Sequence, residues 1–121
     1  MTPTTTPAQP ALVLYRVVDH DPPVEDDFLS DRQRGLQPAP HLPLEIWDGM
    51  SVFDTPAAAR GLARWRLRKG YVARTFIAAV IVQAEGPLRA QPSPPPRGHW
   101  TLWGEPEHVR ARATIIERLG G

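Results

Sequence analysis

The stretch GMSVFDTP at residues 49–56 decides the fold class, because it joins a strand directly to a helix. Its first half is rich in residues that favour strands. Thr55 then offers a capping hydroxyl, and Pro56 suits the first position of a helix. We therefore expect a short strand followed by the main helix of the protein, over about 55–69, which Gly70 ends.

The expected helix has one apolar face and one basic face. Its apolar residues recur at helical spacing and predict the buried face: Ala58, Leu62 and Trp65. Its arginines lie four apart and predict an exposed face: Arg60, Arg64 and Arg68. Such a stripe can contact nucleic-acid phosphates, but no nucleic-acid motif accompanies it. We therefore favour a solvated helix face, with a nucleic-acid partner as the less favoured alternative.

Further strand-forming runs lie on both sides of this unit, and proline clusters separate them. The runs span residues 11–18, 71–84, 88–90, 99–103 and 111–119, and for the last run a helix is the alternative to the favoured strand. Single helical turns are expected at 22–29, 45–48 and 105–109. Most of the 15 prolines fall outside the periodic segments and mark long loops, because proline removes a backbone donor. The pattern predicts an α+β fold in which one main helix packs on a bent, mostly antiparallel sheet.

The length of 121 residues predicts a single domain over 11–121, preceded by a disordered tail over 1–10. The net charge is only +1, so the overall charge does not favour binding to nucleic acid or to anionic membranes. The absence of cysteine excludes a thiolate nucleophile and a sulfur-ligated zinc site, and we expect no metal. The longest apolar run, 76–82, is too short to span a bilayer, and the N-terminus lacks a signal-peptide pattern. We expect a cytoplasmic protein with no membrane partner.

Three strand-forming segments each carry one polar residue among apolar ones: Arg16, Ser51 and His99. Burying a polar group costs free energy unless the group is paired or used, so we expect the three to meet at one pocket. Arg16 suits a phosphate or carboxylate clamp, and an ion pair with a nearby acid is the alternative. His99 suits a proton shuttle, and pairing of its ring with a backbone carbonyl is the alternative.

Aromatic and acidic residues near the C-terminal end extend this candidate site. Trp100 is a candidate platform on which a nucleobase or nicotinamide would stack, although tryptophans in small domains are more often core residues. Glu105 and Glu107 flank Pro106 and can serve as acid and base, or bind a ribose hydroxyl. Acids are also favoured at the start of a helical turn, which is the simpler explanation.

Four motifs together resemble a family of small bacterial proteins with the fold of ADP-ribosyltransferases. They are LYR at 14–16, DFLS at 27–30 with RG at 34–35, WDGMSVF at 47–53, and GHWTLWG at 98–104. In ADP-ribosyltransferases an arginine or histidine on the first strand holds the dinucleotide, and Arg16 matches it by position. A serine region follows, which Ser51 matches in part, since Val52 and Phe53 replace the usual Thr-Ser.

The resemblance also implies a chemistry. A glutamate near the last strands acts on the ribose in that family, and Glu105 and Glu107 imitate the Glu-x-Glu pair. RNA 2'-phosphotransferases share the fold and use arginines with a histidine, a pattern that Arg16, Arg34 and His99 also fit. The resemblance thus implies binding of NAD or a related phosphorylated nucleotide, with NAD as a substrate rather than a tightly bound cofactor. The alternative is a non-catalytic protein-interaction module that retains the fold.

Overall fold

The computed structural model describes residues 11–121, so the expected tail over 1–10 lies outside it. Six strands form one sheet: β1 (Leu12–Val18), β2 (Met50–Phe53), β3 (Arg74–Val82), β4 (Arg89–Pro92), β5 (His99–Trp103) and β6 (Ala113–Gly120). The helices are η1 (Glu25–Phe28, a 3-10 helix), α1 (Leu44–Trp47), α2 (Pro56–Arg68) and α3 (Pro106–Ala111). The prediction of an α+β fold with one main helix is confirmed.

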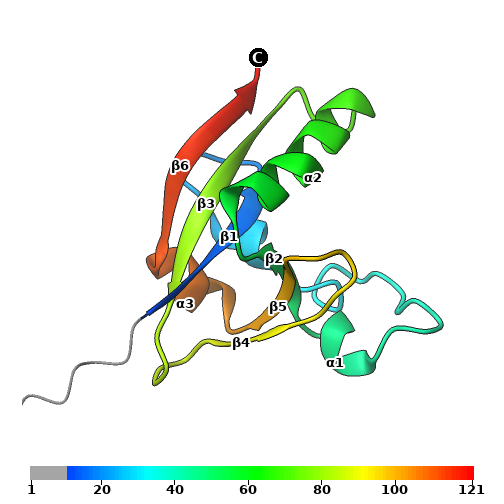
Figure 1. Cartoon of the computed structure of the whole chain (residues 1–121), viewed down its shortest axis with the longest axis vertical. Coiled ribbons are helices and arrows are strands. Elements are labelled where there is room, and N and C mark those ends of the chain that lie inside the picture. The colour runs from blue at the N-terminus through cyan, green and yellow to red at the C-terminus, as the bar shows by residue number, and fades with distance from the viewer. Residues whose placement is uncertain (1–10) are drawn as a thin grey trace, which may run out of the picture.

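The strand order is β4-β5-β2-β1-β3-β6, and every neighbouring pair is antiparallel. β1 pairs with β3 along its whole length, from Leu12 opposite Val82 to Val18 opposite Phe76. β1 and β2 are joined only at Tyr15 opposite Phe53. The sheet is therefore nearly divided between β1 and β2, into the part with β3 and β6 and the part with β5 and β4 (Figure 1).

Helix α2 begins and ends where the sequence predicts. The Oγ1 atom of Thr55 accepts a hydrogen bond from the backbone N–H of Ala58 at 3.2 Å, so the capping hydroxyl is used. Gly70 follows the helix with φ of 73°, a conformation that favours glycine. The helix covers one face of the sheet (Figure 1), where Ala59 and Ala63 are fully buried. They pack with Val17, Phe53 and Ile77.

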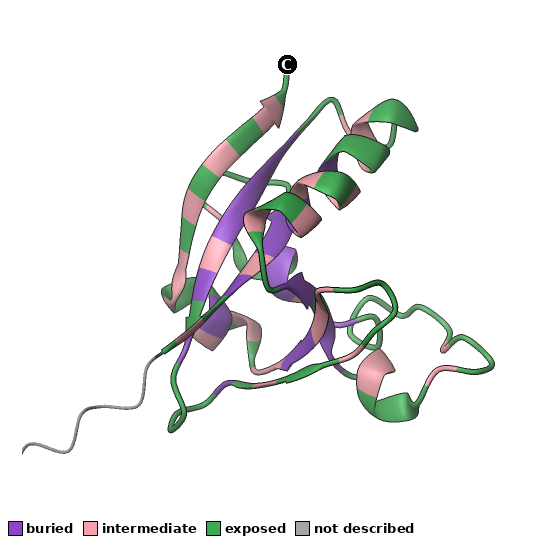
Figure 2. Ribbon diagram, viewed as in Figure 1, coloured by how far each residue is buried: buried purple, intermediate pink, exposed green. Residues whose placement is uncertain are grey.

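The predicted orientation of α2 is wrong for Trp65 and for Arg60. Trp65, expected in the core, is 41% exposed. Small residues make the closest contact with the sheet instead, while Leu62 is only partly buried. Arg60 is half-buried, because its Nε lies 2.7 Å from a carboxylate oxygen of Glu117 on β6. The helix is thus rotated toward its alanines, and its outer surface carries exposed residues (Figure 2).

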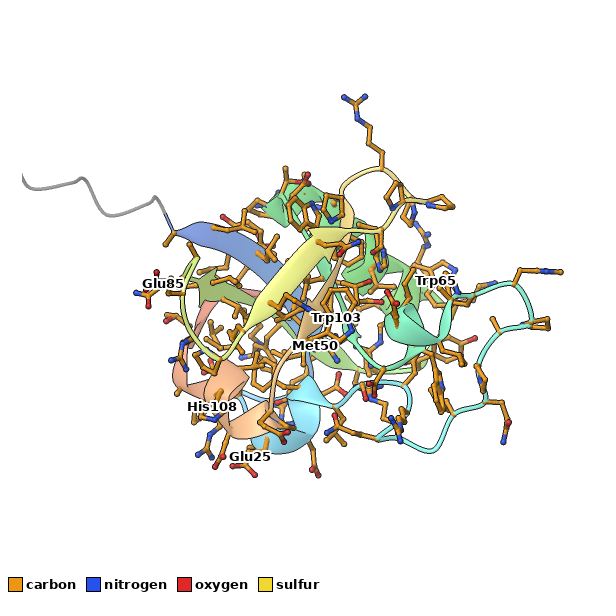
Figure 3. The ribbon with its side chains drawn as sticks, turned by 90° about the horizontal axis from the view of Figure 1, so that it is seen from below. Glu25, Met50, Trp65, Glu85, Trp103 and His108 are labelled. Atoms are coloured by element: carbon orange, nitrogen blue, oxygen red, sulfur yellow. The ribbon has the colours of Figure 1, made fainter. Side chains whose placement is uncertain are left out.

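The opposite face of the sheet holds the larger core, which η1 and α3 cover. Phe28 of η1 and Val109 of α3 are fully buried there. They pack against residues from four strands: Leu14, Val18, Met50, Val52, Phe76, Ala78, Val80 and Leu102. Glu25 of η1 lies 3.7 Å from Arg110 of α3, and the two short helices sit on one side of the molecule, as the labelled Glu25 and His108 show (Figure 3). Helices on both faces explain why β3 is buried along most of its length (Figure 2).

Several boundaries differ from the prediction at strand ends. The expected strand over 71–84 is shorter, Arg74–Val82, because Gly70 and the residues after it turn the chain before the strand begins. The final segment forms the strand β6 rather than a helix. Among residues 11–121, no helix is long and apolar enough to cross a membrane.

Candidate functional site

Arg16 is held inside the molecule by three backbone carbonyls. It lies on β1, on the sheet face that η1 and α3 cover, and only 7% of the residue is exposed. Its Nε donates to the carbonyl of Asp27 at 2.7 Å, and Nη1 donates to the carbonyl of Ser51 at 2.7 Å. Nη2 makes a longer contact with the carbonyl of Leu29, at 3.4 Å. The guanidinium therefore bridges the gap where β1 and β2 separate.

The positive charge of Arg16 has no direct counter-charge among residues 11–121. None of the described ion pairs includes Arg16, so the alternative of an ion pair with a nearby acid is wrong. Burial, and next the nearby charge of Arg34, lower the pKa of Arg16 to about 10, against the opposing charges of Asp27 and Asp31. The group stays charged at neutral pH. A buried cation that contacts only neutral carbonyls is a site where an anion is favoured.

The carboxylate of Asp27 is buried close to Arg16 but is engaged elsewhere. It accepts hydrogen bonds from the backbone N–H groups of Asp19 and Val24, each at 2.9 Å. It also lies 3.1 Å from Nδ1 of His20. These contacts fix the turn between β1 and η1, and that turn places the Asp27 carbonyl against Arg16.

A cleft of about 210 Å³ opens beside Arg16, at the point where the sheet divides. Its walls come from β1, α2, β2 and the segment after η1: Arg16, Val17, Val18, Asp19, Asp27, Leu29, Asp31, Arg34, Met50, Ser51, Leu62 and Arg66. Two further arginines thus accompany Arg16. Arg34 is exposed, and Arg66 lies 3.1 Å from the carboxylate of Asp19. The cleft is polar, because three arginines and three aspartates, Asp19, Asp27 and Asp31, contribute to its lining.

Three of the four expected ligand-binding residues line this cleft. Arg16, Arg34 and Ser51 come together although they are far apart in the sequence. Ser51 is exposed, and its backbone carbonyl, rather than its hydroxyl, contacts Arg16. Trp100 does not line the cleft; it is partly buried and packs against the larger core.

His99 lies outside the cleft, so the expectation that it meets Arg16 and Ser51 is wrong. It pairs with Phe53 in the sheet and packs edge-to-face on that ring, with centroids 5.7 Å apart. Phe53 belongs to the cluster beneath α2, whereas Arg16 points to the opposite face. Nδ1 of His99 lies 2.8 Å from the carbonyl oxygen of Ser93 and 2.9 Å from its hydroxyl. The alternative of a ring paired with a backbone carbonyl therefore describes this histidine.

The two candidate glutamates also lie outside the cleft. Glu105 precedes α3 and lines a separate hollow of about 280 Å³ together with Trp103. Glu107 is exposed in the first turn of α3, with a carboxylate oxygen 3.8 Å from Nε2 of His108. Met50 borders both hollows, and Figure 3 labels Met50 and Trp103 in the same region of the molecule.

Asp19 and Arg66 are among the cleft residues that the predicted site lacks. Both are ordinary charged residues in sequence, one after a strand and one in a helix. Nothing in the spacing of 47 residues between them indicates that they meet, and only the packing of α2 against β1 brings them together. No family model matches the chain, and no curated protein or solved structure matches it. The geometry of the cleft therefore carries the functional argument.

Proposed function

We propose that the cleft at Arg16 binds the phosphate groups of a nucleotide, NAD or a related phosphorylated nucleotide. The observation that carries this proposal is the buried guanidinium, which contacts three neutral carbonyls and forms no ion pair with the described residues. Arg34 lines the same cleft, is exposed and forms no ion pair with the described residues, so it adds a second cation there. Arginine suits phosphate because its planar donors match the spacing of phosphate oxygens.

Arg16 has hydrogen-bond donors left over for such a ligand. A guanidinium has five N–H donors, of which three are used by the carbonyls of Asp27, Ser51 and Leu29. The two remaining donors would bind phosphate oxygens. A cleft of about 210 Å³ is smaller than the roughly 300–1,000 Å³ of pockets that enclose a whole small-molecule ligand. The phosphates would therefore lie inside, and the nucleoside would extend over the rim past Arg34.

The proposal includes the ADP-ribosyltransferase-like fold that the sequence resemblance implies. Its support is the meeting of Arg16, on the first strand, with Ser51, on the second, at one cleft. The position of the glutamates favours binding over transfer, because neither Glu105 nor Glu107 lines the cleft. We therefore propose a nucleotide-binding protein that does not use the glutamate-dependent transfer step of that family.

Calorimetric titration with ADP-ribose, NAD, pyrophosphate and adenosine tests the proposal. Adenosine carries the base and the ribose without phosphate, so it should bind far more weakly than ADP-ribose. Arg34→Gln should weaken ADP-ribose binding about tenfold, which corresponds to the lower end of the value of a charged hydrogen bond.

Arg32→Gln is the matched control. Arg32 is an exposed arginine in the same segment, but its Nη1 lies 3.4 Å from Asp48 and it does not line the cleft. Its substitution should leave the affinity unchanged. Equal affinities for adenosine and ADP-ribose, or equal losses in the two variants, would contradict the proposal.

A further inference from the structure

The C-terminal half of α2 and the turn that follows it present two aromatic rings to solvent. Trp65 is 41% exposed and Tyr71 is 64% exposed. The two rings pack edge-to-face, with centroids 5.4 Å apart and an interplanar angle of 73°. This arrangement holds the rings in a fixed relation at the surface, where they cover only part of each other.

Cations that form no ion pair among residues 11–121 neighbour these rings in the sequence. Residues 56–74 contain six arginines and lysines and no acidic residue, although the whole chain has 14 basic and 13 acidic residues. Within the described chain, Arg60 pairs with Glu117 and Arg66 pairs with Asp19, whereas the exposed cations nearest the rings form no ion pair. We call these cations and the two rings the aromatic–basic patch: Arg64, Trp65, Arg68, Lys69 and Tyr71.

The helix itself explains only part of this patch. Cations are favoured in the last turn by the helix dipole, which accounts for Arg68 and Lys69. The dipole does not account for an exposed tryptophan and tyrosine in the same place, because large aromatic side chains gain most when they are buried. The combination of exposed rings and unpaired cations indicates a ligand that offers both flat apolar surfaces and negative charge.

We propose that the aromatic–basic patch binds single-stranded nucleic acid. Unpaired bases stack on exposed aromatic rings, while lysine and arginine contact the phosphates between them. An anionic membrane fits less well, because the exposed residues beside Trp65 on α2 are basic, and among the described residues of 56–73 no large aliphatic side chain is exposed. This inference goes beyond the proposed function and does not depend on it, since Arg66 is the only α2 cation that lines the cleft.

Fluorescence anisotropy with a labelled single-stranded oligonucleotide of about 12 nucleotides tests this inference on the full-length protein. Trp65→Ala should weaken binding about tenfold, because it removes a stacking platform. The double variant R64Q/R68Q should also weaken binding. The fall of log K with log salt should become shallower by about 1.4, or about 0.7 for each lost phosphate contact. Arg97→Gln, in an exposed position of the loop before β5, is the matched control and should bind like wild type.

Three results would overturn the inference. The first is an oligonucleotide affinity that Trp65→Ala and R64Q/R68Q leave at the wild-type value. The second is equally tight binding of poly-glutamate, unaffected by Trp65→Ala, since this would show that charge alone recruits the ligand. The third is binding to vesicles rich in anionic lipid in preference to the oligonucleotide. Circular dichroism of each variant confirms that the folded state is intact before binding is compared.

Discussion

Replacing Arg16 with lysine should destabilise the protein although it preserves the charge. The guanidinium joins β1 to η1, to β2 and to the residue after η1 through contacts of 2.7, 2.7 and 3.4 Å. A lysine ammonium lacks the forked geometry that reaches carbonyls on both sides, so at least one of the two short hydrogen bonds is lost. A hydrogen bond to a charged group contributes roughly 1.5–3 kcal/mol. We expect a decrease of about 2–4 kcal/mol in the free energy of unfolding, including the weaker third contact.

Urea denaturation followed by circular dichroism measures this loss. The midpoint should fall while the m-value stays unchanged, because the folded state remains equally compact. Arg34→Lys is the control, since Arg34 is exposed, and its effect should stay within about 0.5 kcal/mol. If Arg16→Lys unfolds at the wild-type urea concentration, the three carbonyl contacts contribute nothing and Arg16 does not bridge the divided sheet.

Three further substitutions test the packing. Thr55→Ala should cost about 1 kcal/mol in urea denaturation, because it removes the hydroxyl that caps α2. Gly49→Ala should cost roughly 1–3 kcal/mol, because the new methyl group would collide with Cγ2 of Thr101; a variant as stable as wild type would refute the close approach of β2 and β5. Trp65→Ala should cost only about 1–2 kcal/mol, below the roughly 3–5 kcal/mol of a fully buried tryptophan, and a larger loss would show that the ring is part of the core.

Local chemistry explains what the sequence predicts correctly. Thr55 and Pro56 favour a helix start through their own side chains, and α2 begins there. The apolar, β-branched run in β3 favours a strand, and the structure has one there. Arg16 stands out because a cation in the middle of an apolar strand requires acceptors. These features depend on neighbours in the sequence, so the α+β class and the anchor of the cleft can be predicted from the chain alone.

The errors come from features that only tertiary packing determines. The rotation of α2 depends on how closely it approaches the sheet, and the small side chains of Ala59 and Ala63 allow a contact that a tryptophan would prevent. The face from which His99 emerges depends on its pairing with Phe53, which places it on the side opposite Arg16. Arg66 reaches the cleft only because α2 lies across β1. None of these relations leaves a local pattern in the sequence.

Side-chain NMR of 15N-labelled arginine tests the central claim most directly, because it observes the guanidinium that is proposed to hold the phosphate. The Nε–H group of Arg16 is buried and hydrogen-bonded to the carbonyl of Asp27, which should slow its exchange with water and make its signal observable. We predict that millimolar pyrophosphate or ADP-ribose shifts the signals of Arg16 and Arg34 and leaves that of Arg97 unchanged. An Arg16 signal that neither ligand moves at saturating concentration would contradict the account.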